Sequence, residues 1–129
     1  MSTIVPIALE KSYLEGMGLV LEDPSEDDSY VESEEENRAP SKSHTFHVGK
    51  ILVTVIEAGP GKVHIKGLPD DEFVQVLKGR LILTLDDGTR FEFEQGDSLV
   101  VPKGYVGYWE MPEPYRELVV IDTEAMGAH

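Results

Sequence analysis

Short extended segments separated by glycine-containing turns fill residues 72–111, and this pattern constrains the fold more than any other feature of the chain. Apolar and polar residues alternate over residues 80–85, which predicts a strand with one buried face. Residues 73–78 are also extended, and the intervening Gly79 predicts a strand, a turn and a second strand paired with the first. Asp86-Asp87-Gly88, with alternation resuming at Phe91 and Phe93, predicts a β-hairpin. Strands this short and this regularly divided indicate an all-β sandwich or barrel.

The length of 129 residues fits one domain and is too short for two ordinary ones. We divide it into an N-terminal arm (1–21), an acidic linker (22–43), a barrel (44–123) and a C-terminal tail (124–129). The chain has no Cys, which excludes disulfides and thiolate chemistry. No segment approaches the ~20 apolar residues that span a bilayer. We therefore expect a cytoplasmic protein without a membrane partner.

Acidic residues dominate the charge, which is -14 at pH 7. Residues 22–36 contain nine acids and no base, so the rest of the chain has 16 acids against 11 bases. This excess argues against nucleic acid as a partner, because phosphate binding requires clustered Lys and Arg. We interpret the acidic run as a linker that charge repulsion keeps extended. A loop that binds a divalent cation is the alternative, but the run lacks Gly and the EF-hand spacing.

The N-terminal residues are apolar and are interrupted by Pro6. Ile4, Val5 and Ile7 flank this proline, which suits an edge strand or an arm because proline donates no ladder hydrogen bond. Residues 9–15 are expected to form one or two helical turns that end at Gly16. An apolar arm ahead of a small barrel commonly packs on a second subunit, so we expect a homodimer formed through this arm.

Alternation also orients the strands before residue 72. Residues 45–56 predict one long strand, and Gly59-Pro60-Gly61 turns the chain into residues 62–66. One face of this last segment carries two lysines, which an interior face would not bury. The opposite face is therefore expected to point into the barrel, and it consists of Val63, Ile65 and Gly67.

The histidines do not form a metal-binding pattern. His64 lies on the face with the lysines and is expected to point to solvent. His44 and His47 are three positions apart, which on a regular strand puts them on opposite faces. They are therefore not expected to bind one metal ion together.

Two spacings resemble the conserved motifs of the cupin superfamily. The first contains Gly59, positions 65 and 67, Glu72 and Gly79, separated by five, one, four and six residues. The second contains Gly96, Pro102, Gly104 and positions 107 and 111, separated by five, one, two and three residues. The segments GRLILTLDDG, FEQGDSLVVPKG and GYWEMPEPYRELVVI are similar to a branch of small cupins that includes ethanolamine-utilisation cupins and relatives of ureidoglycine aminohydrolase. The resemblance covers roughly residues 45–121. It implies the cupin double-stranded β-helix, a jelly-roll barrel, and a dimer.

The resemblance also implies a metal site that this chain does not reproduce. Metal-binding cupins have His at the positions occupied here by Ile65, Gly67 and Gly107, and the carboxylate of Glu72 corresponds to the fourth ligand. Only Glu72 matches. A first-row metal needs about three or four nitrogen, sulfur or oxygen donors around one point. We therefore expect neither a metal nor another cofactor at the family's usual site.

A pocket is predicted in place of the metal. Tyr105, Trp109 and Met111 share one face of their strand with Gly107, where the missing imidazole is expected to leave space that Trp109 lines. Glu72 lies across the interior. The predicted cavity is apolar and aromatic with one carboxylate, a composition typical of a small-molecule site. The alternative for Trp109 is a core residue that fills the barrel.

Glu72 is the candidate catalytic acid or base, because a carboxylate on an apolar inner face requires a partner or a raised pKa. The alternative is a structural role, with a hydrogen bond or salt bridge to one of four residues: Tyr105, Tyr108, Trp109 or Arg116. With one inward carboxylate, no glycosidase-type pair is expected.

Arg116 completes the candidate ligand-binding residues, with Tyr105, Trp109 and Met111. In the family pattern a basic pair tends to occupy positions 116 and 117, and here the second residue is Glu117. This difference weakens the case for an anionic substrate at Arg116.

Three functions are compatible with these observations. The first is a metal-independent module that binds a small organic ligand between Glu72, Tyr105 and Trp109. The second is a small-metabolite enzyme, a lyase, isomerase, hydrolase or phosphotransferase, that uses Glu72 as acid or base. The third is a structural protein with a filled barrel that recruits a partner through its arm or acidic run. The volume of the barrel cavity separates the third function from the other two.

Overall fold

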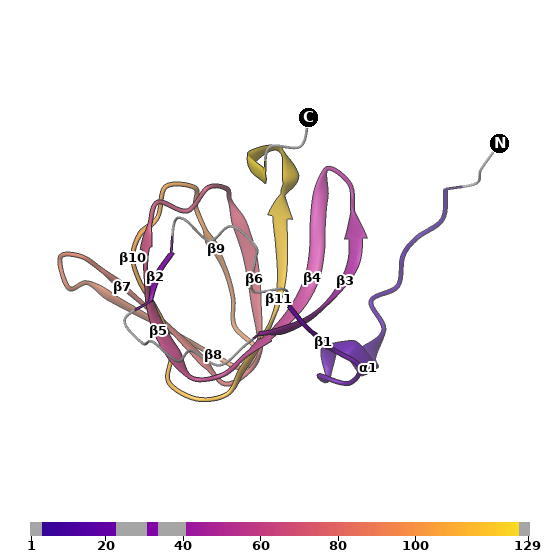
Figure 1. Cartoon of the computed structure of the whole chain (residues 1–129), viewed down its shortest axis with the longest axis horizontal. Coiled ribbons are helices and arrows are strands. Elements are labelled where there is room, and N and C mark those ends of the chain that lie inside the picture. Colours follow the sequence, from indigo (N-terminus) through magenta and orange to yellow (C-terminus); the bar gives the residue numbers. More distant parts are fainter. Residues whose placement is uncertain (1–3, 23–30, 34–40, 127–129) are drawn as a thin grey trace.

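Two antiparallel sheets make up the fold, which confirms the all-β jelly-roll prediction (Figure 1). The computed structural model describes residues 4–22, 31–33 and 41–126. One sheet has six strands, in the order β1 (Val20–Leu21), β3 (Lys42–Val48), β4 (Ile51–Ala58), β11 (Tyr115–Asp122), β6 (Glu72–Lys78) and β9 (Ser98–Val101). The other has five, in the order β2 (Val31–Ser33), β5 (Gly61–Lys66), β10 (Val106–Met111), β7 (Arg80–Leu85) and β8 (Arg90–Glu94). The helices are α1 (Lys11–Leu14) and the 3₁₀ helix η1 (Thr123–Met126).

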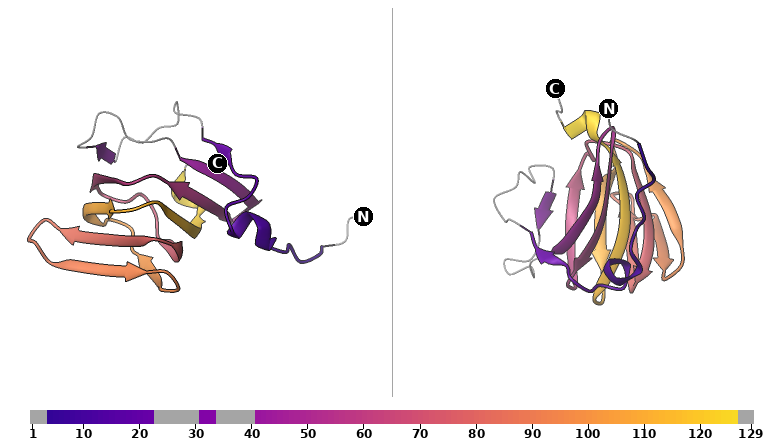
Figure 2. Two further views of the ribbon diagram at one scale, coloured as in Figure 1. Left: turned by 90° about the horizontal axis from the view of Figure 1, so that it is seen from below. Right: turned by 90° about the vertical axis from the view of Figure 1, so that its right-hand side faces the viewer.

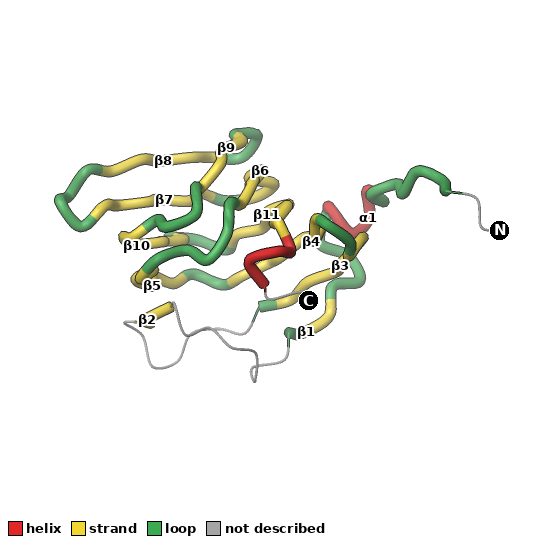
Figure 3. Tube along the Cα trace, turned by 90° about the horizontal axis from the view of Figure 1, so that it is seen from above, coloured by secondary structure: helices red, strands yellow, loops and turns green. Residues whose placement is uncertain are grey.

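The two sheets extend further toward the N-terminus than the range predicted for the barrel. Strands β1 and β2, which both precede residue 44, lie at the ends of the two sheets and pair with β3 and β5 (Figure 3). Most of the acidic run, residues 23–30 and 34–36, lies outside the described residues. The division into arm, linker, barrel and tail stays a prediction.

The turn at Gly79 links the two sheets and does not join a pair of strands. The predicted hairpin is confirmed, because β7 and β8 pair around Asp86-Asp87-Gly88. The predicted pairing of residues 73–78 with 80–85 is wrong, since β6 belongs to the six-stranded sheet and β7 to the five-stranded one. At the crossover Gly79 has φ +81°, and a Cβ there would collide with the backbone oxygen of Pro114. Only glycine fits at this position, where the chain passes close to the backbone of Pro114 as it crosses from one sheet to the other.

The long strand predicted over residues 45–56 is two strands. The chain reverses at Gly49-Lys50, where Gly49 N donates to Ile51 O at 2.9 Å, and β3 and β4 pair antiparallel on either side. Sequence alternation alone does not detect this turn, because the pattern of apolar residues continues across it. The reversal adds β3 to the outer part of the six-stranded sheet.

A bulge in β3 changes the expected orientation of its two histidines. The register shifts between Thr45 and His47, so that His44 lies opposite Val55 and His47 opposite Val53. Residues directly opposite one another in an antiparallel pair point to the same side. Because Val53 and Val55 share a face of β4, His44 and His47 lie on the same side, and the prediction of opposite faces is wrong. This is the outer side of the sheet, away from the barrel core.

The core lies between the inner faces of the two sheets. Its central members are completely or almost completely buried, namely Val63, Ile65, Leu68, Val76, Leu81, Leu83, Val101, Met111 and Tyr115. The predicted inward orientation of Val63 and Ile65 is thereby confirmed. Each large apolar side chain buried in this way stabilises the fold by about 1.5–3 kcal/mol relative to exposure. The same inner faces position the side chains that line the cavity.

Helix α1 lies against the outer side of the six-stranded sheet (Figure 2). Its bounds agree with the predicted helical turns, and Gly16 follows with φ +93°. The ring of Tyr13 stacks on His44 with 3.6 Å between the ring centroids. Within the described residues, no helix is long and apolar enough to cross a membrane.

Candidate functional site

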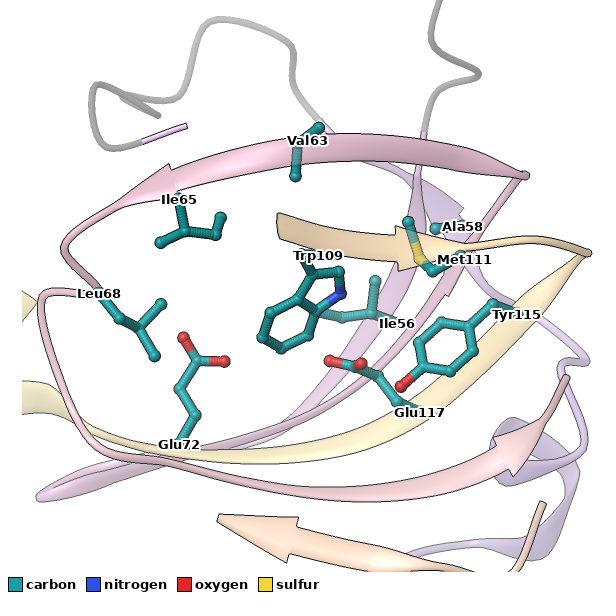
Figure 4. Close-up of a pocket in the computed structure, with 10 residues that line it drawn as sticks. All are labelled: Ile56, Ala58, Val63, Ile65, Leu68, Glu72, Trp109, Met111, Tyr115 and Glu117. Carbon is teal, nitrogen blue, oxygen red and sulfur yellow. The ribbon is translucent and has the colours of Figure 1, made fainter. Parts of the chain in front are cut away.

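A cavity of about 160 Å³ lies inside the barrel, between the two sheets. Its walls are mostly apolar, and its lining residues come from both sheets and from the loop after β5 (Figure 4). They are Ile56, Ala58, Val63, Ile65, Leu68, Glu72, Trp109, Met111, Tyr115 and Glu117. The sequence predicted an apolar, aromatic cavity with one carboxylate, whereas this cavity has two. The barrel is therefore not completely filled by its own side chains.

Glu72 begins β6 and lies on its inner face with Val74 and Val76, which are buried. Burial is the main cause that raises the pKa of Glu72 to about 8. The negative charges of Glu117 and Asp70 raise it further, and so does a hydrogen bond to Asp70. Glu72 is therefore predominantly protonated at neutral pH.

Asp70 is the hydrogen-bond partner of Glu72, a role that the sequence analysis did not assign to it. It lies in the loop before β6 and is only 4% exposed. Burial raises the pKa of Asp70, and a hydrogen bond with Glu72 opposes this rise. One carboxylate oxygen of Asp70, Oδ1, is buried without a hydrogen-bond partner among the described residues.

Glu117 is the second carboxyl group in the cavity wall. It lies on β11 between Ile56 of β4 and Val76 of β6, and it is 6% exposed. Burial raises the pKa of Glu117 to about 7; the neighbouring Tyr115 hydroxyl lowers it and the charge of Glu22 adds to the rise. The Tyr115 hydroxyl points toward Glu117 (Figure 4), although within the described chain neither Tyr115 Oη nor Glu117 Oε1 has a partner at hydrogen-bond geometry. Two polar atoms at the cavity thus lack a hydrogen bond.

Arg116 lies on the opposite face of β11 from Glu117 and does not reach the barrel cavity. Its guanidinium pairs with Glu57, with 3.5 Å between Arg116 Nε and Glu57 Oε1. It lines a separate cavity of about 460 Å³ outside the barrel, beside α1. The expected salt bridge from Arg116 to Glu72 is therefore absent. Alternation in the sequence does not reveal this, because residues of both parities in this part of β11 are buried.

Tyr105 fills the space that was expected at Gly107. Its hydroxyl donates to the backbone oxygen of Tyr108 at 2.8 Å. A Cβ added to Gly107 would lie 2.6 Å from Thr84 O and 2.8 Å from Tyr105 Oη, so no side chain fits there. The expectation of free space at Gly107 is wrong.

Three of the five predicted site residues share the cavity. Glu72, Trp109 and Met111 line it, Tyr105 packs against the core beside it, and Arg116 lies outside. Their roles in binding or catalysis stay predictions.

The residues at the family's metal positions do not fit a metal ion. Ile65 lines the cavity with an apolar side chain, and Gly107 has no room for a larger one. The described histidines do not replace these ligands. His64 lies on the outer face of β5 with its Nε2 2.8 Å from Asp86 Oδ1, and only 19% of its side chain is exposed, which is less than the sequence predicted. Within the part of the chain that the structure describes, no group of three or more His, Cys, Asp or Glu is arranged to hold a metal.

Comparison with known proteins agrees with the fold. Residues 44–117 match the model of the EutQ-like cupin domain. No curated protein matches the chain significantly. Among solved structures, a putative ethanolamine utilization protein Q from Salmonella typhimurium has a TM-score of 0.57 and 20% identity over 64% of this chain and 69% of that protein. The EutQ protein of Clostridium difficile has a TM-score of 0.57 and 18% identity over 64% of this chain and 62% of its own.

A third similar structure is a DUF861-family protein of unknown function from Pseudomonas syringae. Its TM-score is 0.59 and its identity is 16%, over 80% of this chain and 43% of that protein. At these identities the similarity of structures shows the fold alone. The domain match covers more than half of the chain, and together with the two-sheet barrel it identifies the protein as a member of the EutQ-like cupin family.

Proposed function

We propose that the protein binds a small organic molecule in the barrel cavity without a metal ion. The observation that carries this proposal is the space of about 160 Å³ between the sheets, lined by the buried carboxyl group of Glu117 and the half-buried one of Glu72. Water occupies about 30 Å³ per molecule in the liquid, so the space corresponds to about five water molecules. Apolar walls with a few polar groups are the usual composition of a small-molecule site. A carboxyl oxygen at the cavity, Glu117 Oε1, has no hydrogen-bond partner among the described residues and is available to a ligand.

Trp109 provides a direct assay of this function, because it is the only tryptophan in the chain and lines the cavity. A panel of small organic compounds is titrated while tryptophan fluorescence and heat of binding are recorded. Binding should change both signals with one common Kd. The variant Ala58→Leu narrows the cavity and should weaken binding, whereas Val100→Leu, on the exposed outer side of β9, should not. If no compound changes either signal, the barrel does not bind small molecules.

Acid–base catalysis on a small metabolite is the second candidate. Burial raises the pKa of Glu72 to about 8 and that of Glu117 to about 7, so both groups can exchange protons near neutral pH. The variant Glu72→Gln tests this role. Turnover lost with ligand binding retained supports catalysis by Glu72, whereas unchanged turnover excludes Glu72 as the essential acid or base.

The N-terminal arm supports a proposal for assembly as a homodimer. Ile4, Val5 and Ile7 are 96%, 64% and 54% exposed, and the arm extends away from the barrel (Figure 1). Phe73 and Val100 also leave apolar surface exposed on the outer face of the six-stranded sheet. In a symmetric dimer the arm of each chain would pack on the sheet face of the other, so both apolar surfaces would be covered twice by the same contact. A cytoplasmic location is part of the same proposal and rests on the sequence alone.

A further inference from the structure

The ionisable groups that line the barrel cavity are all acidic. Glu72 and Glu117 are the ionisable carboxyls in the described lining, and no Lys, Arg or His lines the cavity with them. Two bases that adjoin lining residues in sequence, Arg116 and His64, lie on outer faces, where they pair with Glu57 and Asp86. The cavity therefore has no positive group of its own among the described residues.

On the basis of the small-molecule binding proposed above, we infer that the barrel cavity selects a small organic cation, a primary ammonium with a short apolar body, which Glu117, Glu72 and Trp109 hold. Three features of the cavity support it: two polar atoms without hydrogen-bond partners, acidic groups without a base, and apolar walls around a small volume. Each of these features specifies a different property of the ligand.

The unsatisfied atoms specify hydrogen-bond donors. Glu117 Oε1 is a buried acceptor, and the hydroxyl oxygen of Tyr115 is buried beside it, 1% exposed overall. An ammonium group has three N–H donors, so it can donate to Glu117 Oε1 and to the Tyr115 hydroxyl oxygen at once and keep one donor for a further acceptor. A neutral alcohol can donate one hydrogen bond to Glu117 and accept one from Tyr115, but it carries no charge to balance a carboxylate. The ammonium is the better match, because its hydrogen bond to a carboxylate is charge-assisted and therefore stronger.

The charge of the cavity specifies the sign of the ligand. A buried carboxyl group avoids the cost of its charge either by holding a proton or by pairing with a positive group, and no described residue of the lining supplies a positive group, so a ligand has to supply it. An anionic ligand would instead add a further negative charge beside Glu72, Glu117 and Asp70. The indole of Trp109 lines the same cavity and attracts a cation with its ring face.

The walls and the volume specify the remainder of the ligand. Six aliphatic residues line the cavity, and they are Ile56, Ala58, Val63, Ile65, Leu68 and Met111. A volume of about 160 Å³ is smaller than the ~300 Å³ lower end of drug-sized pockets. A short alkyl chain of about four carbons beside the ammonium fits both constraints.

Binding of a cation should release protons from the carboxyl groups. The titratable groups around the site are Glu72 on β6, Asp70 and Asp71 before it, Glu117 and Tyr115 on β11, and Asp122 and Glu22, whose charges act on Asp70 and Glu117. Their mutual repulsion favours protonation in the free protein, and an ammonium replaces these protons. An alkylammonium stays charged to about pH 10. The affinity should therefore rise as the pH increases from 6 to 9.

The experiment compares three probes of nearly equal size: n-butylammonium, butan-1-ol and butanoate. Each is titrated into the full chain at pH 6, 7 and 9 while calorimetry and Trp109 fluorescence are recorded. We expect n-butylammonium to bind at least tenfold more tightly than butan-1-ol, to bind more tightly at pH 9 than at pH 6, and to release protons on binding. Butanoate should be the weakest of the three.

A pair of variants assigns the effect to the cavity. Glu117→Gln should reduce the preference for ammonium over alcohol to less than threefold, while Glu113→Gln, in the exposed turn before β11, should leave it unchanged. Circular dichroism and thermal unfolding confirm that both variants fold. If Glu117→Gln does not fold, the pH dependence and the proton release of the unmodified chain decide the question.

The outcomes separate this inference from the function on which it rests. Equal affinity for ammonium and alcohol, tighter binding of butanoate, or affinity that falls with pH would overturn the cation selectivity while leaving a small-molecule site. A lack of binding by all three probes, and by the wider panel, would overturn both.

Discussion

Glu72 and Glu117 face one cavity from two paired strands, and the charge of Glu117 contributes to the raised pKa of Glu72. Glu117 lies opposite Val76, four residues along β6 from Glu72. At about 3.3 Å per residue their backbone positions are separated by about 13 Å along the strands. The side chains extend into the space between these positions, where each carboxyl group is removed from water.

This relationship predicts a stability that decreases as the pH rises. In the unfolded chain Glu72 loses its proton near pH 4.5, whereas in the folded chain it holds the proton up to about pH 8. The folded state therefore binds more protons between these values, and its stabilisation is complete below pH 4.5 and lost as the pH rises through about 8. We expect a loss on the order of 3 kcal/mol from Glu72 between pH 5 and 9, measured by urea unfolding.

The variant Glu72→Gln, which mimics the protonated side chain, should remove the part of this pH dependence that Glu72 contributes and should be more stable than the unmodified chain at pH 9. The part from Glu117, whose pKa burial raises to about 7, should remain. Glu113→Gln serves as the control, and its free energy of unfolding should change with pH as that of the unmodified chain does. An unchanged slope in Glu72→Gln would mean that Glu72 ionises in the folded state as readily as in water.

Substitution of Gly107 should destabilise the barrel strongly. Gly107→Ala places a Cβ 2.6 Å from Thr84 O, so β7 or β10 must shift, and we expect a loss of about 3 kcal/mol or more. Gly67 provides a matched comparison, because it also has a positive φ but no atom lies within 4 Å of an added Cβ. Gly67→Ala should cost about 1–2 kcal/mol from backbone strain alone. Urea unfolding of both variants measures the difference, and equal losses would show that the backbone near Gly107 yields easily.

The purified protein should not retain a transition metal. After incubation with excess Zn²⁺, Mn²⁺ or Ni²⁺ and removal of free ions, elemental analysis should give less than about 0.1 metal per chain, because three metal positions of the family carry Ile65, Gly67 and Gly107. Glu72→Gln should give the same value. A stoichiometric metal that disappears in Glu72→Gln would make metal-assisted chemistry the leading function instead.

Replacement of the apolar arm should separate the proposed dimer. The triple variant Ile4→Ser, Val5→Ser and Ile7→Ser should sediment as a monomer with an unchanged circular dichroism spectrum, because these side chains contribute little to the barrel itself. Phe91→Ser removes a comparable exposed side chain from β8 and should remain dimeric. A monomeric unmodified chain in sedimentation velocity would refute the assembly.

The strands and the inner face of the barrel could be predicted from alternation and turn residues, because a two-residue period fixes which side chains share a face. Val63 and Ile65 illustrate this. They share one face of their strand, the lysines share the other, and the structure places the two apolar side chains in the core. Partner strands were harder to predict. Gly79 and the Gly49-Lys50 turn look alike as local sequences, yet one crosses between sheets and the other makes a hairpin.

Part of the candidate site could also be predicted from the two-residue period of strands. Trp109, Met111 and Glu72 follow from parity within single strands, but Asp70 lies in a loop whose path alternation does not describe. Glu117 lies in a strand whose apolar residues occupy both parities, so alternation does not reveal which of its faces points into the barrel. The bulge that places His44 and His47 on one side leaves no local sequence signal, because it depends on pairing with β4.

The position of β11 has a consequence for the synthesis of the protein. This strand follows all the others in sequence but lies in the middle of the six-stranded sheet, between β4 and β6. A growing chain that has emerged only as far as β10 exposes the unpaired edges of both neighbours and has neither Glu117 nor Tyr115 in its barrel. The six-stranded sheet, and with it the cavity, can therefore be completed only after β11 has left the ribosome, so the barrel closes late in synthesis.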